Sequence, residues 1–81
     1  MKTKLAVYLL KVIRKDISYS QCESKVYRDR LKVKKTEAMR GSTITKIMEL
    51  ESRIEFYSGS INAHDIAKNR IDELIKALSD E

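Results

Sequence analysis

Helix-breaking residues are almost absent from this chain, and this feature limits most strongly what it can fold into. The 81 residues include no proline and only two glycines, Gly41 and Gly59. Proline and glycine are the residues that most often end helices, so the segments between these glycines are free to be helical. The glycines, together with the polar residues around Ser20, are the boundaries that the sequence offers.

These boundaries predict four helices, at about residues 4–17, 21–40, 44–58 and 63–79. Ser20 and Glu23 have the spacing of a capping box, which predicts a helix start near residue 21. Gly41 is expected to end that helix in a left-handed conformation. Ser42 or Thr43 can cap the third helix, and Asn62 can cap the fourth.

Apolar residues recur at helical spacing in three of these segments. The first stripe is Leu5, Leu9, Val12 and Ile13, widened by Ala6, Leu10 and Ile17; the third helix has Ile47, Leu50, Ile54 and Tyr57; the fourth has Ala67, Ile71, Leu74 and Leu78. Because the connections are short, neighbouring helices should be antiparallel. We therefore predict one all-α domain, residues 1–81. It forms an antiparallel helical hairpin or a small bundle of about four helices, which closes on itself or is completed by dimerisation. A strand at residues 26–35 is the minority alternative, because apolar and basic residues alternate there.

Charge is distributed unevenly along the chain. Residues 1–40 hold twelve basic and four acidic residues, a net charge of +8, whereas residues 41–81 hold five and eight, a net charge of −3. Such asymmetry predicts an acidic partner for the first half. That partner is a nucleic acid, a membrane surface, another protein or the second half of the chain itself.

The basic residues gather most densely in the stretch RDRLKVKK, residues 28–35. Like-charged neighbours four residues apart on a helix cost about 0.2–0.5 kcal/mol each, which indicates that an anionic group lies nearby. The candidate residues for binding an acidic partner or a nucleic acid are Lys25, Arg28, Arg30, Lys32, Lys34 and Lys35.

An internal explanation for part of this charge is also available. If the second and third helices fold back about Gly41 and Ser42, residues whose numbers add up to about 83 become neighbours. This register predicts four opposite-charge matches: Lys34 with Glu49, Lys32 with Glu51, Arg28 with Glu55 and, with the charges reversed, Asp29 with Arg53. Charges beside an apolar seam set the register of packed helices, so these pairs would fix how the hairpin closes.

No residue pattern predicts catalysis, a cofactor or a metal site. His64 is the only histidine and Cys22 the only cysteine, so neither a Cys/His zinc cluster nor an internal disulfide can form. The acidic residues lie on expected solvent faces, and no glycine-rich phosphate loop is present. We therefore predict that the protein is not an enzyme.

The function predicted from these observations is that of a small intracellular, cytoplasmic helical binding protein. It would dock on a larger protein and modulate it, or form a homodimer, through whichever helix face keeps apolar residues exposed. Its size and its lysine- and isoleucine-rich composition suit a phage- or plasmid-type accessory or inhibitor factor. The alternative is a nucleic-acid-binding protein that contacts phosphates through its N-terminal half. No apolar run approaches the roughly 20 residues of a membrane span.

Overall fold

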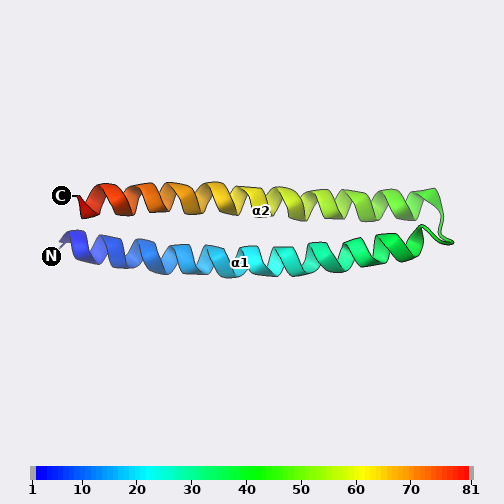
Figure 1. The fold of residues 1–81 in the computed structure, drawn as a ribbon, viewed down its shortest axis with the longest axis horizontal. Helices are drawn as coiled ribbons and strands as arrows, with labels where there is room; N and C mark the ends of the chain where they lie inside the picture. Colours follow the sequence, from blue (N-terminus) through cyan, green and yellow to red (C-terminus); the bar gives the residue numbers. More distant parts are fainter. Residues whose placement is uncertain (1, 81) are drawn as a thin grey trace.

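Two long antiparallel helices make up the fold. The computed structural model describes residues 2–80, in which α1 spans Lys2–Ala38 and α2 spans Ile44–Ser79. The molecule is a rod of 61 × 14 × 12 Å, in which the start of α1 and the end of α2 lie at the same end (Figure 1). The prediction of an all-α antiparallel hairpin is therefore confirmed.

The prediction of four helices is wrong, because the two inner boundaries do not exist. Ser20 and Glu23 lie inside α1, and Gly59 and Asn62 lie inside α2. A helix cap contributes about 1 kcal/mol, and one glycine in a helix costs about as much relative to alanine. Packing along two helices of 36 and 37 residues outweighs these local preferences. The strand alternative is also wrong, since residues 26–35 are helical.

The turn between the helices lies where the sequence predicts it, but it is built differently. The amide of Ser42 donates to the carbonyl oxygen of Ala38 at 2.8 Å, and Gly41 has no positive φ, so the predicted left-handed stop is absent. Thr43 then caps α2 from an extended conformation, with its Oγ1 accepting from the amide of Lys46 at 3.4 Å. This cap sets the direction in which α2 leaves the turn.

One face of each helix is turned toward the other helix, and we call the contact between them the seam. Its residues recur at alternating spacings of three and four, which is the pattern of a coiled coil. The seam of α2 is Ile47, Leu50, Ile54, Tyr57, Ile61, His64, Lys68, Ile71, Ile75 and Leu78. The seam of α1 is Thr3, Val7, Leu10, Arg14, Ile17, Gln21, Ser24, Arg28, Leu31, Lys35 and Ala38. The α2 seam is thus mainly apolar, whereas six of the eleven α1 positions are polar.

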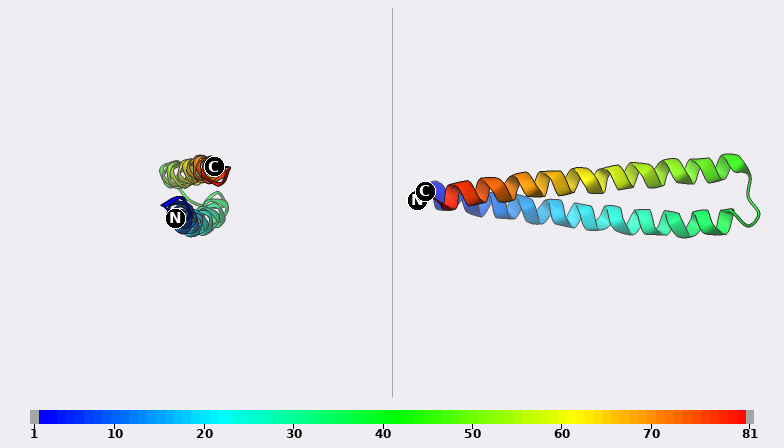
Figure 2. Two further views of the ribbon diagram at one scale, coloured as in Figure 1. Left: turned by 90° about the vertical axis from the view of Figure 1, so that its left-hand side faces the viewer. Right: turned by 45° about the horizontal axis from the view of Figure 1, so that its top comes forward.

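The apolar core is small: Ile61 and Ile71 are buried singly along α2, and the one cluster of buried apolar residues in the described chain lies near the turn. Leu31, Ala38 and Leu50 form a buried cluster against which Ile47, Ile54 and Tyr57 pack. The predicted third-helix stripe therefore does face the core. Within residues 2–80 the two helices lie side by side and no third helix or strand covers either of them (Figure 2). Most residues outside the seam are exposed.

Most of the predicted apolar stripe of the first segment does not face the core. Leu5, Leu9, Val12 and Ile13 are all exposed, whereas Leu10 and Ile17, which were expected to widen the stripe, are turned toward α2 together with Val7. Leu74 of the fourth-helix stripe is exposed as well. Within residues 2–80, neither helix has a stretch that is apolar and long enough to cross a membrane.

Candidate functional site

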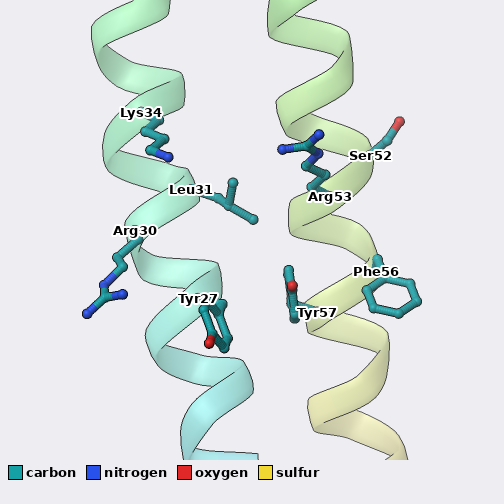
Figure 3. Close-up of a pocket in the computed structure, with 8 residues that line it drawn as sticks. All are labelled: Tyr27, Arg30, Leu31, Lys34, Ser52, Arg53, Phe56 and Tyr57. Carbon is teal, nitrogen blue, oxygen red and sulfur yellow. The ribbon is translucent and has the colours of Figure 1, made fainter.

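A groove runs between the two helices on one side of the hairpin, about two turns from the loop, and we call it the aromatic groove. It has a volume of about 520 Å³. Four residues from each helix line it: Tyr27, Arg30, Leu31 and Lys34 from α1, and Ser52, Arg53, Phe56 and Tyr57 from α2 (Figure 3).

Three aromatic rings form the apolar part of the groove. Tyr27 and Tyr57 stack across the two helices with their ring centroids 5.6 Å apart. Phe56 meets Tyr57 edge-on at 5.4 Å, and Phe56 remains 70% exposed. Tyr27 is 48% exposed, so Phe56 is the ring of the three with the most surface left for a ligand.

The charged part of the groove is entirely cationic. Arg30, Lys34 and Arg53 line it together with no carboxylate, and none of the three forms an ion pair with another residue of the described chain. Lys34 and Arg53 extend toward the space between the helices, and Arg30 points away from α2 (Figure 3). Facing cations repel one another, so an anionic group bound here would relieve an unfavourable interaction.

The cationic character ends toward the turn. An adjoining depression of about 510 Å³ shares Lys34 and Arg53 with the aromatic groove, but Glu37, Lys46 and Glu49 line it as well. Mixed charges of this kind are already balanced within the protein. The aromatic groove is therefore the part of this side that best fits an anionic ligand.

The six basic residues predicted as one binding set lie on three different sides of α1. Arg30 and Lys34 line the aromatic groove. Arg28 and Lys35 are half-buried at the seam, while Lys25 and Lys32 are exposed and do not line the groove. A single nucleic-acid-binding face made of all six residues is therefore not present in this fold.

The predicted charge pairs are replaced by others in a shifted register. Glu51 pairs with Lys35 at 2.8 Å, not with Lys32, and Arg28 pairs with its neighbour Asp29 at 3.3 Å. Among residues 2–80, no ion pair joins Lys34 to Glu49, Arg28 to Glu55 or Asp29 to Arg53. The reason is that polar residues of the α1 seam, which the apolar spacing does not identify, reach across to α2.

These cross-helix contacts repeat at intervals of seven residues or multiples of seven, and we call them the polar ladder. Arg14 binds Asp72 through two contacts of 2.7 and 3.2 Å, Gln21 binds Asp65 at 2.7 Å, and Lys35 binds Glu51 at 2.8 Å. In each pair the residue numbers add up to 86. The same register would place Arg28 against Ser58, which offers no charge, so one rung of the ladder is missing.

Gln21 is the most buried of the polar seam residues, at 2% exposure. Its Nε2 donates to the carbonyl oxygen of Ile61 at 2.9 Å and to Asp65, and its Oε1 accepts from Lys68 at 2.6 Å. The hydrogen bond from Gln21, helped by the charges of Lys68 and Lys25, lowers the pKa of Asp65 below its usual value. A buried polar residue that is satisfied only in one alignment fixes the register of two helices.

The remaining candidate groups do not assemble a reactive site. No cluster of three or more metal-ligating side chains occurs in residues 2–80. His64 has a buried Nδ1 without a hydrogen-bond partner in the described chain, and Cys22 is exposed. Neither residue lines the aromatic groove, so neither is placed to act on a ligand bound there.

A second exposed surface runs along the side of α1 that faces away from α2, and we call it the outer stripe. Its residues are spaced seven apart, from 41% to 70% exposed: Leu5, Val12, Tyr19, Val26 and Val33. The exposed apolar residues of α2 are Ile44, Met48, Phe56, Ile66 and Leu74, which follow no such period. Of the two described helices, only α1 thus carries an exposed apolar stripe with a seven-residue period.

Sequence reasoning missed most of the aromatic groove and misassigned the outer stripe. Arg53, Phe56 and Tyr57 could have been placed beside Tyr27 by aligning the three-four spacing of both helices. The seven-residue period of the outer stripe is present in the sequence, but Leu5 and Val12 were predicted to face the core and the other three residues were not recognised as part of a stripe. No protein-family model, curated protein or solved structure matches this chain.

Proposed function

We propose that this protein is a small, non-enzymatic helical binding protein that docks on a larger protein and modulates it. The aromatic groove is the docking site, and the partner segment is acidic with an apolar or aromatic anchor. The observation that carries this proposal is the composition of the groove: three cations, three aromatic rings and no carboxylate among its lining residues.

Tyrosine and arginine are the residues most enriched at energetically important positions of protein interfaces. In the groove, the exposed ring of Phe56 supplies apolar contact area. Lys34 and Arg53 supply uncompensated positive charge, which speeds association with an acidic surface and rejects basic ones. Two copies of this groove would repel each other, so its occupant is a different molecule.

The first experiment locates the partner on the groove. A photoreactive phenylalanine analogue replaces Phe56 in one variant and Ile66, an exposed residue of α2 outside the groove, in a matched control. After irradiation in an extract of the native host, the Phe56 position should cross-link one protein that the Ile66 position does not. Equal recovery from both positions would count against the groove.

The second experiment measures the contribution of charge with the purified partner. Arg53→Glu should weaken binding at least about tenfold, because it places a carboxylate against the acidic residues of the partner segment. Arg70→Glu, an equal charge change at an exposed α2 position that does not line the groove, should leave affinity within about twofold. Equal losses in both variants would show a general charge effect and contradict the proposal. The partner's own activity, assayed with and without the protein, reports modulation.

A nucleic-acid-binding function is the second candidate, and the groove also supplies the observation that favours it. Single-stranded nucleic acids bind where bases stack on aromatic rings and phosphates meet cations. Mixed-sequence DNA and RNA strands should then bind in a filter assay at about 50 mM salt and be released steeply by about 200 mM. Absence of binding at the lower salt would remove this candidate.

A further inference from the structure

The outer stripe of α1 is an extended apolar surface with a regular period. From Leu5 to Val33 it runs for about 42 Å at 1.5 Å per residue. In a helix that coils around a partner with a seven-residue repeat, positions seven apart stay in one straight line. A second long helix could therefore lie along the whole stripe.

The two edges of the outer stripe carry opposite charge. One edge, the lysine edge, is Lys4, Lys11, Lys25 and Lys32, each one residue before a stripe residue. All four are exposed, and none forms an ion pair within residues 2–80. The other edge, the acidic edge, is Asp16, Glu23 and Glu37, each four residues after a stripe residue; Arg30 interrupts it.

We propose that the outer stripe is the interface of a homodimer in which α1 packs in parallel, and in register, against α1 of a second copy. A twofold axis parallel to the helices brings the lysine edge of each copy against the acidic edge of the other. Flanking charges in parallel helix pairs meet five residues apart. This register places Lys11 opposite Asp16 and Lys32 opposite Glu37 of the second copy.

The same reasoning excludes the antiparallel dimer. There the lysine edges of both copies would face each other, with four lysines on each side. The parallel arrangement also has unfavourable contacts. Lys25 lies opposite Arg30 of the second copy on each edge, and Lys15 and Asp29, each three residues after a stripe residue, lie opposite the same residue of the second copy. The arrangement gains two opposite-charge contacts on each edge and avoids the facing lysine edges, so the parallel orientation has the better balance of charge.

This inference goes beyond the proposed function, because it uses a different surface. The aromatic groove lies between α1 and α2, whereas the outer stripe faces away from α2. A dimer formed through the stripes would leave both grooves open. Failure of one proposal therefore leaves the other standing, and separate measurements test them.

The first test is the mass of the full chain in solution by sedimentation equilibrium. The wild type should have twice the 9.4 kDa mass of the chain. Val26→Asp, which places a charge in the middle of the stripe, should raise the dissociation constant at least about tenfold. Ile66→Asp, the same change on the outer face of α2, should leave it unchanged. Circular dichroism establishes that both variants keep their helices.

The second test fixes the orientation. In a Cys22→Ser background, Leu5→Cys should form a disulfide between two copies under mild oxidation, because a parallel dimer brings both residues to the same end. In an antiparallel dimer the two sites would lie about 42 Å apart, and a mixture of Leu5→Cys and Val33→Cys chains would cross-link to each other. That cross-link, or a monomeric wild type, would overturn the proposal.

Discussion

The missing rung of the polar ladder makes a quantitative prediction: Ser58→Asp should stabilise the hairpin. Arg14, Gln21 and Lys35 each bind an acidic residue on α2, and in each pair the two residue numbers add up to 86. Arg28 lies in the same row of α1, but the α2 residue that this register places opposite it is Ser58. Arg28 is held instead by Asp29 on its own helix, at 3.3 Å. An aspartate at position 58 would offer it the cross-helix partner that Arg14 already has.

The size of the gain follows from the exposure of the groups. The Arg28 side chain is 26% exposed, so it is already partly ordered, and a partly exposed ion pair contributes at most about 1 kcal/mol. The new acid would lie three residues from Glu55, which costs about 0.2–0.5 kcal/mol. A net gain of about 0.5 kcal/mol remains, which corresponds to a rise in melting temperature of about 2–4 °C.

Thermal and urea unfolding, followed by circular dichroism, measure this gain. Asn62→Asp is the matched control: it adds the same charge to α2, also three residues from an acid, Asp65, but at an exposed position outside the seam. The gain should disappear when Arg28→Gln is added to Ser58→Asp. If the control stabilises equally, or if the gain survives the loss of Arg28, the ladder register is incorrect.

Three further predictions concern the helices and the ladder. Gly59→Ala should stabilise the protein by about 0.5–1 kcal/mol in urea unfolding, since Gly59 lies inside α2 and its missing side chain would meet no atom within 4 Å; no gain would mean that α2 is not continuous there. Asp72→Asn should destabilise by about 0.5–1 kcal/mol through loss of the two contacts with Arg14, and the same change in an Arg14→Gln background should cost clearly less. The folded pKa of Asp65 lies below its unfolded value, so its contribution to stability is full above the unfolded pKa and is lost as the pH falls through the folded one. Carboxyl chemical shifts should show the pKa of Asp65 below that of an ordinary aspartate, and Gln21→Leu should raise that pKa; an unshifted Asp65 would contradict the hydrogen bond.

The local patterns of the sequence predicted α2 and the turn better than they predicted α1. The spacing of Ile47, Leu50, Ile54 and Tyr57 identified the inward face correctly, because on α2 the apolar face and the seam coincide. Thr43 was among the residues expected to cap the helix after the turn. Each of these features is decided by residues close together in sequence, and such preferences survive in the folded chain when packing agrees with them.

The inward face of α1 could not be chosen by hydrophobicity. Its outer side is richer in large apolar residues than its seam, where Arg14, Gln21, Arg28 and Lys35 lie. A polar residue is favourable at the seam of α1 only when an acidic residue of the facing helix binds it, as Asp72 binds Arg14. The choice thus depends on the register, and the register was displaced from the predicted one because its polar determinants were not recognised.

The antiparallel ladder also determines the order in which the hairpin can close. Ala38 and Leu50 share the cluster beside the turn and are twelve residues apart, whereas the two residues of the Arg14–Asp72 rung are separated by 58. Closing the longer loop directly would cost only about 1.4 kcal/mol more entropy than closing the shorter one. After the cluster has formed, however, each further rung requires only the next seven or fourteen residues of each helix to be ordered. Folding should therefore begin at the turn and travel toward the open end, and amide hydrogens should exchange fastest where the chain closes last.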